Sequence, residues 1–188
     1  NYNDNNINDI IIVGRIAHPK NGLNLLKALK IFLDRNELGL TIKWAGRKDN
    51  DHKSMKMQKD MTDYIKQNPI IQSNIIFLGE VKDIYGLYKN ARFLIHPSIY
   101  EGLPMVICEA MLIGCPVIAS NVCDHPLILD SARGILFDPN SPESICEAIE
   151  KFNSMTFQQK QAMIDRARDF AENNFSTNKM VESFENIL

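Results

Sequence analysis

The sequence predicts an α/β domain, a Rossmann-like parallel sheet with helices on both faces. Short apolar runs alternate with longer helical patterns, and the links between them are short, which is typical of a parallel sheet with crossover helices. The first of these runs, at 10–14, is continuous, which is typical of a strand that is covered on both faces. A length of 188 residues suits one such domain.

Strands and helices are expected to alternate through the first half of the chain. The run IIIVG at 10–14 is apolar throughout and predicts a buried strand. The segment 22–35 predicts a helix with one apolar face, made of Leu25, Leu26, Leu29, Phe32 and Leu33. The other elements expected here are strand 40–46, a polar helix at 51–67 and strand 74–79.

The second half continues the same pattern. The expected elements are helix 83–90, strand 92–98, helix 104–113, strand 115–120, a turn or short helix at 124–131, and strand 134–139. Two or three helices are expected to fill 141–187, with Phe157, Ile164, Ala167 and Phe170 among the inward residues. Ligands of such a sheet bind at the carboxyl ends of the strands, so the site is sought there.

Composition excludes several classes of protein. A net charge of −2 gives no reason to expect nonspecific nucleic-acid binding, so no nucleic-acid partner is expected. No apolar run approaches the ~18 residues of a membrane span, and no secretory signal is recognised. Four cysteines lack zinc-type spacing and are expected to be reduced thiols in the core: Cys108, Cys115, Cys123 and Cys146. We therefore expect a cytoplasmic location, or one at the inner face of the membrane.

The start of the chain differs from the rest. Residues 1–8 are polar and rich in asparagine, without periodicity, and then change abruptly to the apolar run. We interpret 1–8 as a linker or the edge of a longer protein, and 9–188 as the domain.

Two cations follow the first strand. Gly14 and Arg15 end the strand, and Lys20 precedes the next helix. Such cations suit an anion such as a phosphate, although both could equally be solvated loop residues. No Gly-x-Gly-x-x-Gly or P-loop sequence is present, which disfavours a dinucleotide site.

The helix expected at 104–113 begins without an evident cap. Pro104 suits the first helical position, whereas Gly102 and Leu103 before it are weak N-caps. The free amides at this start could bind an anion, assisted by the helix dipole. The alternative is a capping box between Ser98 and Glu101, which have the required spacing.

Glu109 is the single charge in this otherwise apolar helix, so we expect it to be buried and to need hydrogen-bond donors. The donors could be protein groups or ligand hydroxyls. Eight helical residues rise ~12 Å, more than the roughly 5–9.5 Å between glycosidase carboxylates. Glu101 and Glu109 therefore fit the two ends of one long ligand, such as a sugar nucleotide, better than the two sides of one bond.

Four segments of the sequence resemble those of a known family. The segment SIYEGLPMVICEAMLIGCPVIAS resembles the Glu-x7-Glu signature of the retaining glycosyltransferases of family 4, which have the GT-B fold. VGRIAHPKNGLNLLKAL, IIFLGEVKDIYGLYKNARFLIHPS and GILFDPNSPESICEAI are similar to further segments of that family, in the same order. The resemblance covers nearly the whole chain and corresponds to the C-terminal, donor-binding half of a GT-B enzyme.

The resemblance implies a function and site roles. The expected activity is hexosyl transfer with retention, from a nucleotide-diphosphate sugar to a glycan or lipid-linked acceptor, in bacterial surface polysaccharide synthesis. Arg15, Lys20 and Glu101 would be catalytic. Donor-binding positions would be Gly14, Gly79, Glu80, Val81, Asp83, Gly102, Leu103, Pro104, Met105, Val106 and Glu109. Glu109 would accept from the ribose hydroxyls, and 79–83 would line the base.

The resemblance also implies what is missing. No cofactor or metal is expected, and the Asp-x-Asp-like DND at 49–51 is interpreted as a loop with a helix cap. The acceptor would bind the absent N-terminal domain, so the isolated chain is expected to be inactive. Peripheral membrane contact would belong to the full-length enzyme.

Some positions depart from the family pattern. AGRKDND replaces a Gly-x-Gly-Pro turn, and Pro126-Leu127 replaces a Pro-Glu step. The methionine side chains of Met105 and Met111 are expected in the core.

Two other classes of protein are alternatives to this function. One is a noncatalytic sugar-nucleotide-binding module, and the other is a phosphorylase- or epimerase-type GT-B enzyme, whose motifs we do not find.

Overall fold

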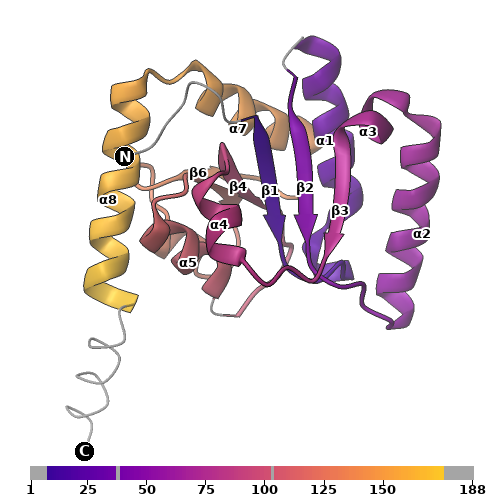
Figure 1. Ribbon diagram of the computed structural model, residues 1–188, viewed down its shortest axis with the longest axis horizontal. Coiled ribbons are helices and arrows are strands. Elements are labelled where there is room, and N and C mark those ends of the chain that lie inside the picture. The colour runs from indigo at the N-terminus through magenta and orange to yellow at the C-terminus, as the bar shows by residue number, and fades with distance from the viewer. Residues whose placement is uncertain (1–7, 37–38, 103, 176–188) are drawn as a thin grey trace, which may run out of the picture.

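The computed structural model describes residues 8–36, 39–102 and 104–175, and shows one six-stranded parallel sheet (Figure 1). The strand order is β3-β2-β1-β4-β5-β6. The strands are β1 Asp9–Val13, β2 Thr41–Ala45, β3 Ile75–Gly79, β4 Phe93–His96, β5 Val117–Ser120 and β6 Ile135–Phe137. The helices are α1 Gly22–Arg35, α2 His52–Gln67, α3 Pro69–Asn74, α4 Ile84–Lys89, α5 Met105–Ile113, α6 His125–Ile128, α7 Pro142–Ser154 and α8 Phe157–Phe175. The parallel α/β sheet confirms the predicted fold class.

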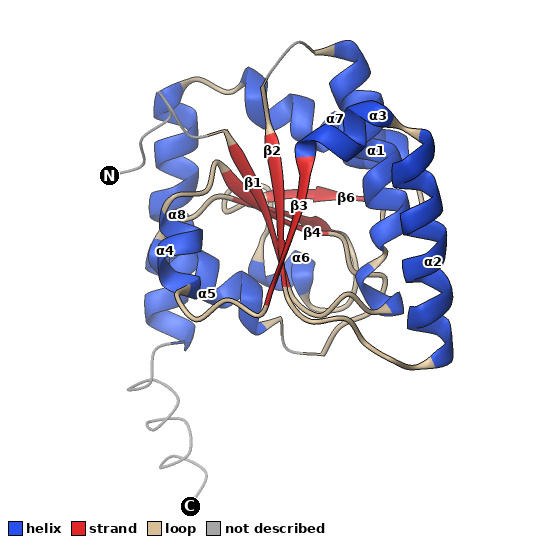
Figure 2. Cartoon of the chain, turned by 45° about the vertical axis from the view of Figure 1, so that its right-hand side comes forward, coloured by secondary structure: helices blue, strands red, loops and turns tan. Residues whose placement is uncertain are grey.

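Helices cover the two faces of the sheet in two separate groups. Helices α1, α2, α3 and α7 lie on one face, and α4, α5 and α8 lie on the other (Figures 1 and 2). Side chains alternate accordingly along β1: Ile10 and Ile12 pack in the first core, Ile11 and Val13 in the second. Burial on both faces explains why this strand is apolar throughout.

Local sequence signals set several helix boundaries. The side chain of Asp51 accepts hydrogen bonds from the amides of Lys53 and Ser54, so it caps α2 as the DND segment predicted. Ser141 caps α7, and Pro142 takes its first position. The apolar face predicted for α1 is buried in full.

Two expectations need correction, and two further features were not predicted. Phe157, the first residue of α8, is 46% exposed and so is not an inward residue. Cys123 is exposed in a loop and is not in the core, unlike the other three cysteines. Strand β3 is at the edge of the sheet, and Phe77 on it is 41% exposed. The short helix α3, which was not predicted, fills 69–74.

Helix α8 buries, fully or in part, the other residues that were expected to face inward near the end of the chain. Ile164 and Ala167 are buried, and Phe170 packs partly buried against the second core. Two helices, α7 and α8, occupy the described part of 141–187, and the rest of that segment lies outside the described residues.

A close backbone contact joins the carboxyl ends of β1, β2 and β3. The amide of Gly14 donates to the carbonyl of Ala45 at 2.9 Å, and the amide of Gly46 donates to the carbonyl of Gly79 at 2.7 Å. Gly46 has a φ of 150°, and a Cβ on it would lie 2.0 Å from the carbonyl oxygen of Gly14. Only glycine fits there, since both the conformation and the space exclude a side chain.

This contact generates a stability prediction. We expect Gly46→Ala to lower the free energy of unfolding by about 3 kcal/mol or more, because the backbone around Gly14 must move. Urea denaturation measures the change. Gly39→Ala is the matched control, since no atom lies within 4 Å of its Cβ position. It should change stability by less than about 1 kcal/mol. Equal effects of the two substitutions would show that the contact at Gly46 carries no strain.

Candidate functional site at the carboxyl ends of the strands

The order of the strands reverses between β1 and β4. Helix α1, which follows β1, packs on one face of the sheet, and α5, which follows β4, packs on the other. The loops that leave these adjacent strands therefore diverge, and the crevice between them is the usual ligand site of an open parallel sheet. The residues predicted to act, Arg15, Lys20 and Glu101, all lie in these two loops or at their ends.

The loop after β1 is fixed against the loop after β2. The amide of Ile16 donates to the carbonyl of Arg47 at 2.8 Å, and the indole Nε1 of Trp44 donates to the carbonyl of Gly14 at 3.0 Å. The guanidinium of Arg15 pairs with Asp49 at 2.5 Å, and its side chain remains 59% exposed. Arg15 is therefore held at the surface of the crevice and stays accessible to an anion.

A hollow of about 420 Å³ lies at the ends of β1, β2 and β3, and we call it the strand-end hollow. Its lining includes Gly14, Arg15, Gly46, Arg47, Glu80 and Val81. Four of these are predicted site residues from two distant segments of the sequence. Arg47 was not predicted; its place after β2, beside β1 in a parallel sheet, is the signal that could have identified it.

Lys20 connects this hollow to Glu101. Its Cε lies 3.1 Å from where a Cβ on Gly14 would be, so the side chain passes over Gly14. Its Nζ forms an ion pair with Oε1 of Glu101, and both side chains are 17% exposed. The structure thus brings the two catalytic candidates Lys20 and Glu101 into direct contact. The sequence predicted both residues but not their pairing.

Glu101 has two further partners. Ser98 Oγ donates to Oε1 at 2.7 Å, and His96 Nε2 lies 3.1 Å from the same oxygen. Ser98 and Glu101 therefore interact, but through their side chains and not as a capping box, because α5 begins only at Met105.

The charge states of this cluster follow from burial and hydrogen bonding. Partial burial alone would raise the pKa of Glu101, but hydrogen bonds from His96, Lys20 and Ser98 outweigh it and hold that pKa well below its ordinary value. Burial lowers the pKa of His96 to about 4, against a smaller opposing effect of its bond to Glu101. At neutral pH the cluster therefore contains a carboxylate and a neutral imidazole.

Helix α5 starts at this cluster with accessible amides. Its N-cap position is Pro104, which has no side-chain hydrogen bond to offer. No acceptor for the amides of Met105 and Val106 is found among the described residues. Met105 is 48% exposed, so its side chain is not in the core as expected, whereas Met111 is fully buried. Gly102 is exposed beside this start, and Leu103 lies outside the described residues.

Glu109 differs from expectation in one respect. It is only half-buried, and its Oε2 accepts a hydrogen bond from the hydroxyl of Tyr88 in α4 at 3.0 Å. The interior of α5 is buried, but its outer positions are not, so the carboxylate needs fewer donors than a fully buried one. A protein donor is thus present, and the other oxygen has no partner among the described residues.

Asp83 has a structural task. Its side chain accepts a hydrogen bond from the amide of Gly86 at 2.8 Å and caps α4. It lies two residues beyond Val81, at the margin of the strand-end hollow. Gly79 contacts Gly46 through its carbonyl and so supports the floor of the same region.

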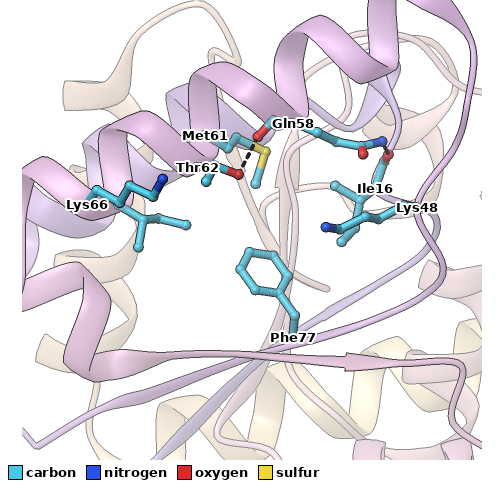
Figure 3. Close-up of a pocket in the computed structure, with 8 residues that line it drawn as sticks. Ile16, Lys48, Gln58, Met61, Thr62, Lys66 and Phe77 are labelled. Atoms are coloured by element: carbon cyan, nitrogen blue, oxygen red, sulfur yellow. Dashed lines mark hydrogen bonds between the residues drawn. The ribbon is translucent and has the colours of Figure 1, made fainter.

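A second apolar hollow lies away from these residues. It has a volume of about 350 Å³ and is formed by α2, β3 and the loop after β1; we call it the edge pocket (Figure 3). Met61 and Phe77 face it, and Lys48 and Lys66 stand at its rim (Figure 3). None of the predicted site residues lines it, and nothing in the sequence pattern indicated it.

The described residues contain neither a cluster of metal ligands nor a membrane-spanning helix. No group of three histidine, cysteine, aspartate or glutamate side chains is close enough to hold a metal ion in 8–36, 39–102 and 104–175. Within the same residues, no helix combines the length and the apolar character that a membrane crossing requires.

The cluster around Glu101 predicts how stability depends on pH. The pKa of His96 is about 4 in the folded chain and near 6.5 when unfolded, so between these values the unfolded chain binds the extra proton. The free energy of unfolding should therefore fall as the pH is lowered from 6.5 to 4, by up to about 3 kcal/mol from this residue. Glu101 acts in the same direction below its own ordinary pKa of 4.5.

Thermal unfolding of the wild type and of His96→Met between pH 8 and pH 4 measures this dependence. The variant should show a shallower loss of stability over the upper part of the range, since it lacks the buried imidazole. Identical pH profiles would mean that His96 does not titrate as its burial requires.

The sequence is similar to those of known glycosyltransferases. The family model "Glycosyl transferases group 1" matches residues 2–170. The uncharacterized glycosyltransferase MJ1607 of Methanocaldococcus jannaschii is 30% identical over 148 residues, which are 76% of this chain and 35% of that protein. The capsular polysaccharide biosynthesis glycosyltransferase CapH of Staphylococcus aureus is 30% identical over 118 residues, 63% of this chain and 32% of that protein.

Solved structures agree on the fold. Anabaena Alr3699/HepE, crystallised in complex with UDP and glucose, superposes with a TM-score of 0.83 at 20% identity, over 96% of this chain and 48% of that chain. This likeness shows the Rossmann-like architecture of the GT-B glycosyltransferases. The chain thus spans about a third of the two sequence relatives and about half of the structural one. The match over residues 2–170 shows that this chain belongs to the glycosyl transferases group 1 family.

Proposed function

We propose that this chain is the donor-binding domain of a retaining glycosyltransferase. Its ligand would be a nucleotide-diphosphate sugar lying across the carboxyl ends of β1 and β4. One observation carries the proposal. The strand-end hollow, the cation of Lys20, the ionised carboxylate of Glu101 and the unpaired amides at the start of α5 follow one another along the carboxyl ends of the strands.

The proposed binding mode assigns one part of the donor to each group. The base and ribose occupy the strand-end hollow beside Glu80 and Val81. The diphosphate lies between Arg15, Lys20 and the amides at the start of α5, where the helix dipole favours negative charge. The transferred sugar lies against Glu101. The presence of UDP and glucose in the Anabaena structure supports this assignment.

The same groups suit the chemistry of transfer. Negative charge builds on the departing nucleotide diphosphate, and fixed positive groups that face it lower the barrier. Arg15 is accessible, and Lys20 is partly buried, where its charge is less screened by water. With this positive charge supplied by the protein, we expect donor binding without a divalent metal.

The acceptor and the pathway are further parts of the proposal. The names of relatives such as CapH support a role in bacterial surface polysaccharide synthesis, with a glycan or lipid-linked acceptor. In a two-domain GT-B enzyme the acceptor faces the donor across a cleft. Without that facing wall, the reactants are neither held together nor shielded from water, so the isolated chain should bind donor but transfer no sugar.

Calorimetric titration tests the proposed function. The panel contains UDP, GDP and ADP with UDP-glucose and GDP-mannose, each measured with and without EDTA. We expect one nucleoside diphosphate to bind in preference to the others and EDTA to have no effect. A parallel assay of residues 1–188 with the same donors and mixed glycan acceptors should show no product. Absence of binding by every nucleotide would contradict the donor site, and clear transfer would contradict the two-domain interpretation.

A second experiment separates the two roles open to Glu109. We expect Glu109→Gln to weaken binding of the preferred nucleoside diphosphate by about 1.5–3 kcal/mol, because a charge-assisted bond to the ribose is lost. Tyr88→Phe is the matched control: it removes the hydroxyl that bonds Glu109 but leaves the carboxylate in place. It should affect binding little. If both substitutions lower the melting temperature equally and neither weakens binding, Glu109 is a structural partner of Tyr88.

A further inference from the structure

The two oxygens of the Glu101 carboxylate are in different environments. Three donors converge on Oε1: Lys20 Nζ, Ser98 Oγ and His96 Nε2. No hydrogen bond to Oε2 is found among the described residues, and the side chain keeps 17% of its surface exposed. The carboxylate is therefore anchored through one oxygen, which leaves the other available to a ligand.

Proton positions in this anchor follow from the acceptors. An ionised carboxylate can only accept, so the hydrogen of the neutral imidazole of His96 must be on Nε2. Its Nδ1 is then an acceptor, and it is buried without a partner among the described residues. An unpartnered buried acceptor costs stability, and a hydrophobic side chain of similar size at this position would avoid that cost. The imidazole is better explained by what Nε2 does for Glu101 than by packing.

The anchor rests on a second layer of hydrogen bonds. Ser120 Oγ donates to the carbonyl of Ser98 at 2.6 Å. His125 Nδ1 donates to the carbonyl of Ser120 at 2.7 Å, and its ring lies edge-on to that of His96 with centroids 5.5 Å apart. Both serines and both histidines are buried. These hydrogen bonds connect the end of β5 to the segment after β4 that carries Ser98 and Glu101.

Lys20 cannot by itself hold Glu101 during binding. Under the proposed function the ammonium group of Lys20 must also face the donor diphosphate, which competes with Glu101 for it. His96 and Ser98 are buried, and both contact Oε1 without involving Lys20. They supply the part of the anchor that is independent of the ligand.

We propose that His96 and Ser98 are positioning residues that hold Oε1 of Glu101 inward, so that Oε2 faces a hydroxyl of the transferred sugar. The claim about the sugar rests on the proposed function, whereas the claim about the carboxylate rests on the ligand-free geometry alone. The two parts can therefore be tested separately.

The first test uses the ligand-free chain. Carboxyl carbon NMR follows the titration of Glu101 in the wild type, His96→Met, His96→Gln and Ser98→Ala. His96→Met removes the donor and should raise the pKa of Glu101, as should Ser98→Ala. His96→Gln places an amide nitrogen close to the position of Nε2 and should restore most of the effect. A pKa of Glu101 that is equal in all four proteins would overturn the positioning role.

The second test measures the contribution of the sugar to affinity. The probe pairs are UDP with UDP-glucose and GDP with GDP-mannose, and the quantity is the ratio of the two dissociation constants within a pair. We expect His96→Met to reduce this ratio about tenfold with nearly unchanged affinity for the diphosphate, and His96→Gln to recover it. Ile149→Val, a mildly destabilising change in the core of α7, controls for loss of stability.

The outcomes distinguish the two claims. If the pKa of Glu101 changes in the His96 variants but neither probe pair binds, the donor site and the role of Oε2 are contradicted. The positioning of Glu101 by His96 and Ser98 is still supported in that case. If the diphosphates bind and the ratio is unchanged in His96→Met, the anchor does not serve the sugar and the proposal is overturned.

Discussion

The reversal of strand order between β1 and β4 is the constraint on which the rest of the site depends. Because α1 and α5 pack on opposite faces, the chain must diverge at the carboxyl ends of these two adjacent strands. The divergence leaves room for Lys20 and Glu101 to meet from segments that are 81 residues apart. It also leaves the start of α5 accessible. Every group that we assign to the donor lies around this one opening.

The charged residues of the opening differ in how deeply they are buried and in how firmly they are paired. Glu101 would be costly to ionise at its depth without donors, and Lys20, Ser98 and His96 meet that need through a single oxygen. Arg15 stands farther out, paired to Asp49 but largely exposed, where a weak surface ion pair can be exchanged for a phosphate. The inner part of the site is therefore preorganised and the outer part can respond to a ligand. This division suits a donor whose sugar must be oriented and whose diphosphate must be captured and released.

The sequence predicted the sheet because strands and helices depend on local patterns, and the same patterns led us to expect a ligand site at the carboxyl ends of the strands, which stays a prediction. Short apolar runs marked the strands, and the charged residues Arg15, Lys20 and Glu101 in the loops after β1 and β4 suggested the ligand edge. Contacts between distant segments could not be predicted from local patterns. No sequence feature near Arg15 indicates its ion pair with Asp49, and none near Glu109 indicates its hydrogen bond with Tyr88. His96 lies in an apolar strand end, where the sequence gives no sign that its Nε2 meets Glu101. Met105 was misplaced because helical periodicity does not show that the first turn of α5 opens on the crevice.

Amide NMR mapping tests the central claim, that the donor binds at the opening between β1 and β4. The isotopically labelled chain would be titrated with UDP-glucose and with GDP-mannose. We expect the largest shifts on Gly14, Arg15, Glu80, Val81 and Met105, which come from three segments that meet only in the fold. Shifts confined to Met61, Ile65 and Phe77 would place the ligand in the edge pocket and would rule out binding at this opening.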